Sequence, residues 1–401
     1  MKKIILFYSL LTGLSAFAQG DSMYVSGRFL YNHCNETVIL RGVNYPVLDD
    51  WDFPANMNNG NERISEIEKS GANCVRIQWH NKYDDPQRGP YSLKDLDSLL
   101  TRCARAKMIP IVSLGDLTSN GDWSIFPQII TAWWIQPAVV QLIKKHQRYL
   151  IINPANEFGH FNWGDNNAQT NIINFENNYK VCITTLRNAG IHVPIMIDAP
   201  DGGQQMKVLI QVGQSLLAAD PLKNILFDVH TYWKVYPTLN PTQAEIENEF
   251  LLAKASNLAF VIGEVANIQP GDNSQCTYDI SNIYPEVLKV AKLYEIGWMA
   301  WCWHKDTCSD RELSSTGLFN NLTPWGNDFI NNVEYGIKNS RRTITTFEQC
   351  LCVATRFYRK KCISRRRVFY VNCTVYKNRI TGQICETKCE SCHPEIGPRP
   401  F

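Results

Sequence analysis

Short apolar runs alternate with longer amphipathic segments along most of the chain. The runs are too short for helices and are bounded by turn residues, so they predict buried strands. The longer segments repeat apolar positions with the helical period. The predicted strands cover residues 38–44, 72–79, 109–114, 150–152, 193–197, 225–230, 258–264 and 297–303. The predicted helices cover residues 61–70, 93–108, 133–147, 166–189, 206–219, 242–256, 284–294 and 325–337.

This alternation predicts an α/β fold in which parallel strands are joined by crossover helices. Eight strand–helix units suit a closed (β/α)8 TIM barrel, which we expect to span residues 24–337. An open doubly wound sheet is the rival arrangement. It is disfavoured because no glycine-rich phosphate loop follows the first strand. The predicted fold class is therefore a TIM barrel with a short cysteine-rich carboxyl-terminal tail.

The first 18 residues have the pattern of a signal peptide. Lys2 and Lys3 precede an apolar stretch, residues 4–14, and Ala16 and Ala18 supply the small residues of a cleavage site. The apolar stretch is too short to span a bilayer, and no later run is long enough to do so. We therefore expect a soluble protein without a membrane span, secreted or periplasmic.

Charge and cysteine set the tail, residues 338–401, apart from the rest. Residues 340–401 hold 13 Lys and Arg against 4 Asp and Glu, whereas the remainder holds 27 against 34. An acidic body is not expected to bind nucleic acid. Seven of the 14 cysteines lie in residues 350–392. Their spacing at Cys385, Cys389, Cys392 and His393 is loosely like a zinc site, but cysteines of exported proteins more often form disulfides. We interpret the tail as disordered or translated from a shifted frame.

Polar residues gather where the predicted strands end, which is the face where barrel enzymes carry their active sites. None of these residues has metal-ligand spacing, and the chain has neither a nucleophile elbow nor a phosphate loop. We therefore expect no metal and no organic cofactor. The strand ends carry Asn44, Arg76, Gly115, Asp116, Asn156, Glu157, Asp198, His230, Tyr232, Glu264, Trp301 and Trp303.

Two carboxyl groups on different strands of a barrel can flank one glycosidic bond. One must be protonated to release the leaving oxygen, and the other ionised to attack the anomeric carbon. Arg76 beside one of them would favour its ionised form. Tryptophan faces can stack on sugar rings, and Asn and His side chains can bind hydroxyls. These residue types favour glycoside chemistry.

The chain also resembles a known family, the glycoside hydrolase family 5 enzymes, which include cellulases and β-mannanases. The resemblance spans about residues 38–332. Its most specific motifs are LIINPANE at 150–157, FDVHTY at 227–232, VIGE at 261–264 and GWMAW at 297–301. Three further segments are most similar to the bacterial mannanase branch: LRNAG at 186–190, ADPLKN at 219–224 and LTPWGN at 322–327.

The resemblance implies a role for each matching residue. Glu157 would be the acid/base and Glu264 the nucleophile of a retaining reaction. The other implied contacts are to substrate or to these two carboxyls: Asn156 to the sugar 2-hydroxyl, Arg76 and Tyr232 to the nucleophile, His230 near the acid/base, and Trp301 as the floor of the subsite. Trp303 is expected in the core, whereas Trp51, Trp123 and Trp163 in rim loops could line the cleft or pack.

The chain departs from the family's pattern at two places. The family usually has a His-Asp pair after the third strand, where this chain has Gly115 and Asp116. The mannanase branch also carries a tryptophan after the fifth strand, where this chain has DGG at 201–203. The first departure implies weaker subsite binding or catalysis. The second leaves the sugar identity open.

From these features we expect a retaining endo-β-1,4-glycanase that acts on β-mannan or glucomannan by a two-glutamate double displacement. The alternatives are an endo-β-1,4-glucanase (cellulase) and a non-catalytic polysaccharide-binding protein on the same barrel. The expected partner is the polysaccharide substrate, and the protein is expected to be a monomer.

Overall fold

The computed structural model describes residues 22–33, 36–46, 63–80, 92–161, 167–271, 276–340, 352–364, 367–378 and 384–389. The predicted signal peptide, residues 1–18, lies outside these ranges. Trp51 and Trp163 also lie outside them, as do Cys392 and His393 of the zinc-like spacing. No helix in the described ranges is both long and apolar enough to cross a bilayer.

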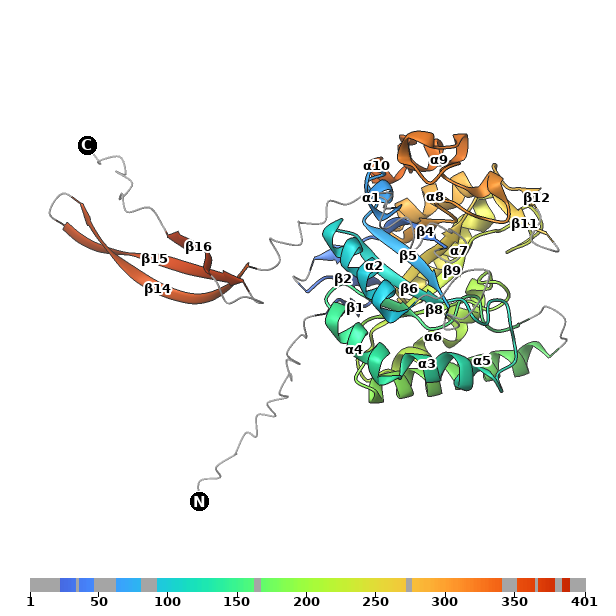
Figure 1. Ribbon diagram of the computed structural model, residues 1–401, viewed down its shortest axis with the longest axis horizontal. Coiled ribbons are helices and arrows are strands. Elements are labelled where there is room, and N and C mark those ends of the chain that lie inside the picture. Colours follow the sequence, from blue (N-terminus) through green and yellow to red (C-terminus); the bar gives the residue numbers. More distant parts are fainter. Residues whose placement is uncertain are drawn as a thin grey trace, which may run out of the picture.

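Eight parallel strands close into a barrel in the order β10-β13-β4-β5-β6-β7-β8-β9 (Figure 1). The predicted TIM barrel is therefore confirmed. Its strands are β4 (Arg41–Tyr45), β5 (Cys74–Trp79), β6 (Ile109–Leu114), β7 (Ile151–Asn153), β8 (Ile195–Asp198), β9 (Ile225–His230), β10 (Phe260–Val265) and β13 (Gly297–Ala300).

Helices follow the strands and surround them (Figure 1). They are α1 (Arg63–Glu68), α2 (Leu93–Arg105), α3 (Ala132–Trp134), α4 (Pro137–His146), α5 (Ala168–Asn188), α6 (Met206–Ala219), α7 (Gln243–Ala255), α8 (Tyr284–Leu293), α9 (Pro324–Asn331) and α10 (Ile337–Ser340). The single helix predicted at 133–147 is divided. A π-helical turn, Pro127–Thr131, precedes α3, and Pro137 restarts the chain as the first residue of α4. Proline suits that position because its nitrogen needs no partner there.

The amino end of the barrel is closed by a small antiparallel sheet that the sequence pattern did not reveal. It consists of β1 (Tyr24–Ser26), β2 (Phe29–Tyr31) and β3 (Thr37–Val38). Met23 and Leu30 of this region cluster with barrel residues such as Ile111 and Met299, all of them buried. This end is apolar, so the polar chemistry is left to the carboxyl ends of the strands.

Two further sheets lie outside the barrel. A hairpin of β11 (Ile268–Pro270) and β12 (Cys276–Asp279) follows β10. The tail contains a three-stranded antiparallel sheet of β14 (Cys352–Ser364), β15 (Arg367–Asn378) and β16 (Ile384–Cys389). Val371 and Val375 are buried in it, and Cys373 is disulfide-bonded. The expectation of a tail without regular structure is therefore wrong for these residues.

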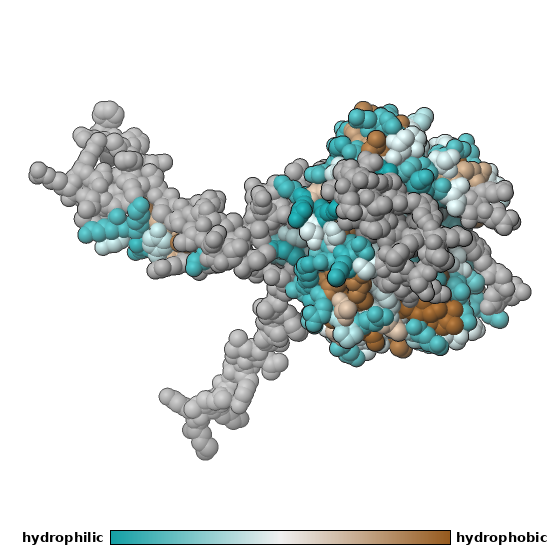
Figure 2. Space-filling model, viewed as in Figure 1, coloured by the Kyte–Doolittle hydropathy of each residue, from teal (hydrophilic) through white to brown (hydrophobic). Residues whose placement is uncertain are grey.

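Hydrophilic side chains cover most of the described surface seen in Figure 2, and hydrophobic ones gather in the region of α3 and α5. Helix α5 contributes exposed Ile173 and Val181.

A buried ion pair fastens α5 to the segment that leads into β9. Arg187 Nε and Nη2 donate to the two carboxylate oxygens of Asp220 at 2.9 and 2.8 Å. The same carboxylate accepts the backbone N–H groups of Leu222 and Asn224. Burial alone would raise the pKa of Asp220, but Arg187 and these hydrogen bonds hold that pKa below its usual value. The pair lies within two of the mannanase-like motifs found in the sequence.

We expect Asp220→Asn to lower the free energy of unfolding by about 3 kcal/mol at neutral pH, because the buried Arg187 loses its counter-ion. A carboxyl whose folded pKa is depressed stabilises above its unfolded pKa of about 3.9 and loses that effect as pH falls through the folded value. The difference between wild type and Asp220→Asn should therefore be constant from neutral pH to about pH 4 and shrink below it. Urea unfolding across this pH range measures it, and an equal difference at every pH would contradict the assignment.

Candidate active site

Glu157 lies in the turn that follows β7. The turn begins at Pro154, and Glu157 has a backbone φ of +49°, a left-handed conformation that is costly for a residue with a side chain. The conformation is held from both sides: the Glu157 N–H donates to Asp198 Oδ2 at 2.9 Å, and its carbonyl accepts the N–H of Ser119 at 3.1 Å. The Glu157 side chain is 15% exposed.

Glu264 lies on β10 with its side chain only 4% exposed. Its Oε1 accepts a hydrogen bond from Arg76 Nη1 at 2.8 Å. Its Oε2 accepts a hydrogen bond from the hydroxyl of Tyr232 at 2.7 Å. Both carboxylate oxygens therefore have donors that favour the ionised form.

Arg76 is fully buried on β5 and joins the two halves of the site. Besides Glu264, its guanidinium donates to Asn44 Oδ1 at 3.0 Å and to Asn156 Oδ1 at 2.6 Å. It also donates to Asn153 Oδ1 at 2.8 Å and to Asp198 Oδ2 at 3.2 Å. A guanidinium with this many buried acceptors fixes their relative positions.

His230 lies at the end of β9, fully buried between four carboxyl groups. Its Nδ1 is 2.7 Å from Glu157 Oε1 and 3.5 Å from Glu264 Oε2. Its Nε2 is 3.5 Å from Asp228 Oδ2 and 3.7 Å from Asp198 Oδ2. Burial lowers the pKa of His230, but these negative charges outweigh it and raise the pKa well above its ordinary value.

The segment 201–203, where the mannanase branch has a tryptophan, packs against His230. Gly203 has a φ of +76°, and a Cβ placed on it would lie 2.4 Å from Cγ of the imidazole. The carbonyl of Gly203 also accepts the N–H of His230 at 2.8 Å. Position 203 therefore has no room for a side chain.

The two glutamates titrate as an interacting pair. Burial and the charge of Glu157 raise the pKa of Glu264, although His230 and Arg76 act to lower it. Burial also acts to raise the pKa of Glu157, but its hydrogen bond with His230 and the charge of His230 lower that pKa. Arg76 thus favours ionised Glu264, as expected from the sequence, but burial has the larger effect on the pKa of Glu264 and raises it.

Glu157 and Glu264 each place a carboxylate oxygen within 4.8 Å of the other, and of a His230 nitrogen. A second group, Asp198, Asp228 and His230, is equally close. Sequence spacing did not show these clusters, because their members come from different strands. Arg76 and His230 already lie in contact with these carboxylates, so the expectation that the site works without a metal is kept as a prediction.

The two tryptophans at the end of β13 differ in burial, as expected. Trp303 is fully buried, and its Nε1 donates to the carbonyl of Gly317 at 2.9 Å. Trp301 is half-buried, and its Nε1 has no hydrogen-bond acceptor among the described residues. Trp123 packs among aromatic rings, with centroids 4.7 Å from Phe158 and 5.3 Å from Phe126, so packing accounts for it.

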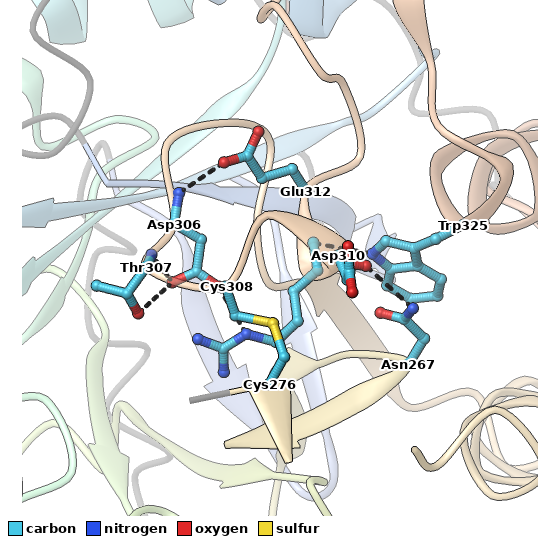
Figure 3. Close-up of a disulfide and its surroundings, with 9 residues drawn as sticks. Asn267, Cys276, Asp306, Thr307, Cys308, Asp310, Glu312 and Trp325 are labelled. Atoms are coloured by element: carbon cyan, nitrogen blue, oxygen red, sulfur yellow. Dashed lines mark hydrogen bonds and ion pairs between the residues drawn. A yellow bond between two sulfur atoms is a disulfide. The ribbon is translucent and has the colours of Figure 1, made fainter. Parts of the chain in front are cut away.

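The loop after Trp301 is held by a disulfide between Cys276 of β12 and Cys308 (Figure 3). Within this loop Arg311 Nε donates to Asp306 Oδ2 at 2.6 Å. The Arg311 guanidinium also lies 5.9 Å from the ring of Tyr232, which itself contacts Glu264. The disulfide therefore supports one wall of the site.

Replacing Cys276 and Cys308 together by Ser should lower the free energy of unfolding by about 3–4 kcal/mol, since the bond closes a loop over a sequence separation of 32. Thermal unfolding with and without a thiol reductant measures this. The reductant should lower the melting temperature of the wild-type barrel to that of the double variant, in which the disulfide of Cys373 in the tail remains for it to break. A wild type indifferent to complete reduction would contradict the prediction.

The sequence-predicted residues Arg76, Asn156, Glu157, His230, Tyr232 and Glu264 thus meet in one site, with Trp301 at the end of the neighbouring strand. Asp198 was noted at a strand end without a role, and it bridges Arg76 and Glu157. Asp228 was not singled out. It lies two residues before His230 on the same strand, so alternation along β9 was the signal that could have found it.

A closed parallel barrel whose strand ends bring two glutamates together, with an arginine, a histidine and a tyrosine around them, defines a glycoside hydrolase. The family model described as Cellulase (glycosyl hydrolase family 5) matches residues 32–307, and the chain belongs to this family.

Relatives carry more specific names. A mannan endo-1,4-beta-mannosidase of Cellvibrio japonicus is 28% identical over 338 residues, which cover 83% of this chain and 71% of the relative. A mannan endo-1,4-beta-mannosidase of Salipaludibacillus agaradhaerens is 26% identical over 330 residues, covering 81% and 95%. Among solved structures, a β-mannanase of Streptomyces thermolilacinus with mannohexaose has a TM-score of 0.63 at 22% identity, covering 80% of this chain and 96% of that one. This last similarity shows the fold.

Proposed function

We propose that this protein is a retaining endo-β-1,4-mannanase that cleaves β-mannan and glucomannan by double displacement. The observation that carries the proposal is the approach of Glu157 and Glu264, whose nearest carboxylate oxygens lie within 4.8 Å. Retaining enzymes hold their two carboxyl groups about 5–5.5 Å apart, whereas inverting enzymes need about 6.5–9.5 Å to admit a water molecule. The short separation supports direct attack on the sugar.

In the first step Glu264 attacks the anomeric carbon and forms a covalent glycosyl-enzyme. Glu157 gives its proton to the oxygen of the leaving chain at the same time. In the second step Glu157 takes a proton from water, and the resulting hydroxide releases the sugar from Glu264. Arg76 and Tyr232 orient the attacking carboxylate through the hydrogen bonds described above.

The first step requires the proton of the pair to be on Glu157. In the ligand-free site His230 favours ionised Glu157, while burial favours protonated Glu264. A glycosidic oxygen that approaches Glu157 accepts a hydrogen bond from its protonated carboxyl and so favours the protonated form. Arg76 and Tyr232, which donate hydrogen bonds to Glu264, stabilise the negative charge that then remains on Glu264. We therefore assign His230 to positioning Glu157, and Arg76 and Tyr232 to stabilising ionised Glu264.

The substrate-binding roles follow from position. Asn156 precedes Glu157 and is fixed by Arg76, so its amide is placed to bind the sugar 2-hydroxyl. Trp301 offers the exposed part of its ring as the floor of the subsite, whereas its Nε1 is buried. We propose the polysaccharide as the partner and a monomer as the working form.

We choose mannan as the proposed substrate because the relatives from Cellvibrio and Salipaludibacillus are named for it. The cellulase alternative is supported by a relative named beta-mannanase/endoglucanase A in Caldicellulosiruptor saccharolyticus, which is 29% identical over 264 residues that cover 65% of this chain and 18% of that relative. The pattern of residues 1–18 supports export through a signal peptide, which makes the polysaccharide accessible.

Reducing-sugar release from mannan, glucomannan and carboxymethylcellulose decides between these functions. We expect endo-cleavage of mannan and glucomannan, with carboxymethylcellulose slower. The missing tryptophan ring at 201–203 should lower the activity on mannan without changing the preferred substrate to cellulose, since one stacking contact is worth about 0.5–1.5 kcal/mol. Faster release from carboxymethylcellulose would assign the enzyme to the cellulase branch. No release from any polymer would favour the binding-protein alternative.

A further inference from the structure

The side chain of Asp228 is buried on β9 and faces His230, which lies two residues further along the same strand. Neither of its carboxylate oxygens accepts a hydrogen bond from any residue that the structure describes. Its one ion pair among these residues is with Nε2 of His230, at 3.5 Å. A buried carboxylate without a partner is costly. The imidazole of His230 is therefore the group that compensates the charge of Asp228.

The space for this carboxylate is provided by a glycine on the neighbouring strand β10. A Cβ placed on Gly263 would lie 2.0 Å from Oδ2 and 2.4 Å from Oδ1 of Asp228. Gly263 is not among the residues with a positive φ, so its backbone does not itself require glycine. The close approach of the carboxylate explains the glycine instead. The position of Asp228 is thus built into the strand that carries Glu264.

Asp198 also lies near Nε2 of His230, at 3.7 Å, but its carboxylate has other partners. Its Oδ2 accepts hydrogen bonds from Arg76 and from the N–H of Glu157. Asp198 therefore holds the turn at Glu157, whereas the carboxylate of Asp228 is left to face the imidazole.

The other nitrogen of the ring contacts the proposed acid/base. His230 Nδ1 is 2.7 Å from Glu157 Oε1. A doubly protonated ring donates to Glu157 at Nδ1 and directs its second N–H toward Asp228. Burial acts to lower the pKa of His230, but Glu264, Asp228 and Glu157 raise it well above its ordinary value.

Charged and titratable groups surround the ring on several strands. Arg76 of β5 binds two of the carboxylates that lie near it. The groups that face the ring itself are Glu157 after β7, Asp198 of β8, Asp228 of β9, Glu264 of β10 and the ring of Tyr232 at a centroid distance of 6.5 Å.

The proton at Nδ1 matters for the step assigned to Glu157. When Glu157 gives its proton to the leaving oxygen, it becomes a carboxylate. A charged donor stabilises that carboxylate more than a neutral donor does. A ring without a proton at Nδ1 would instead place a lone pair against it.

We propose that Asp228 is a positioning residue of the reaction, whose carboxylate keeps the imidazole of His230 doubly protonated so that Nδ1–H supports Glu157 as it ionises. The inference deepens the proposed function and rests on it for the consequence in catalysis. The protonation of the ring can be measured without any substrate, so the two parts of the inference are tested separately.

The ring is observed by ¹⁵N NMR of the full-length chain labelled at histidine, with His230→Gln to identify the signals of His230. In wild type we expect both ring nitrogens to stay protonated well above the ordinary pKa of a histidine, about 6.5. In Asp228→Asn the titration midpoint of His230 should fall by at least about one pH unit, because an opposite charge beside the ring is lost.

Asp220→Asn is the matched control for this titration. It also removes a buried carboxylate and lowers stability, but Asp220 follows α6 and binds Arg187 away from the site. The midpoint of His230 should be the same in this variant as in wild type. A wild-type ring that titrates near the ordinary pKa of about 6.5 would overturn the proposal without any variant of Asp228.

The consequence in catalysis is measured with two substrates that differ in their leaving group, at a pH between the two midpoints. Asp228→Asn should lower kcat/KM on mannan about tenfold or more, because Glu157 loses a charge-assisted donor. On an aryl glycoside whose leaving group needs no proton, kcat/KM should stay within about twofold of wild type. A change that only disturbed the fold would lower both values together. If Asp228→Asn does not fold, Asp228→Ser removes the same charge and takes its place.

The failures of the inference and of the proposed function give different results. If wild type cleaves no polymer, the proposed function fails and the catalytic role of Asp228 fails with it. If wild type cleaves mannan but the midpoint of His230 moves by less than about half a pH unit in Asp228→Asn, only the role of Asp228 is overturned. Equal losses on mannan and on the aryl glycoside, or no loss on mannan, would overturn that role as well.

Discussion

Glu264→Gln should lower the turnover of mannan by roughly 10⁴-fold or more, because in the proposed mechanism this group forms the covalent intermediate. Glu157→Gln should lower it by about 10²–10⁴-fold, the usual contribution of a general acid/base. Neither change alters side-chain size much, so the melting temperatures should stay close to that of wild type. Reducing-sugar release measures both. Glu247→Gln, on the outer helix α7, is the control and should retain full activity.

Activated substrates separate the two roles. With an aryl glycoside whose leaving group needs no proton, Glu157→Gln should still form the glycosyl-enzyme rapidly and release a burst of phenol. Azide should accelerate the second step of Glu157→Ala by taking the place of the activated water and give a β-glycosyl azide, whereas any azide product of Glu264→Ala should be α-configured. Rescue of Glu264→Ala with retention of configuration would contradict the double displacement, as would an α-configured product from wild type.

Arg76→Met should be the most damaging single change outside the two glutamates. It removes the cation that contacts both Glu264 and Asp198, all three side chains being buried. Breaking a buried ion pair by removing one partner costs about 3–5 kcal/mol, because the other charge stays uncompensated. The pKa of Glu264, already raised by burial, should rise further without Arg76. Ionised Glu264 then persists only at higher pH, so the acid limb of the activity profile should move upward.

Urea unfolding and the pH dependence of kcat/KM measure these two effects. Arg76→Lys is the matched control, since it keeps the charge but loses the planar fork that reaches Asn44, Asn153 and Asn156 together. It should keep the acid limb near that of wild type while binding substrate less well. An Arg76→Met variant with an unchanged acid limb would show that Arg76 does not lower the pKa of Glu264.

The barrel could be predicted from sequence because its elements carry strong local signals. The bounds of β6, β9 and α6 are those expected, since each apolar run or amphipathic period ends where burial ends. Within residues 22–340, the strands that escaped prediction are short or lack such a signal. Strands β1–β3 have two or three residues each, and β12 is exposed throughout. Their stability comes from tertiary contacts and from the disulfide at Cys276, which sequence patterns do not show.

The part of the site that could be predicted consists of residues at the carboxyl ends of strands. Glu157 and Glu264 were found because a carboxylate directly follows a buried apolar run. Asp228, which helps to raise the pKa of His230, was not found, because it faces His230 from within the barrel. Such contacts depend on the twist and register of neighbouring strands. The direction of the Glu264 pKa likewise follows from burial in the assembled barrel rather than from the neighbouring charge of Arg76 alone.

The left-handed backbone at Glu157 costs stability, but the proposed reaction needs a carboxyl group at this position. Asparagine or glycine adopts this conformation at lower cost than glutamate, by about 1 kcal/mol for glycine. Removing the Glu157 carboxylate would also remove its 2.7 Å contact with His230 Nδ1, which offsets part of this gain. Glycine at position 157 is therefore expected to abolish activity without lowering the stability of the fold. Selection for stability alone does not retain the proposed acid/base, so directed evolution of this barrel has to screen for cleavage at every round.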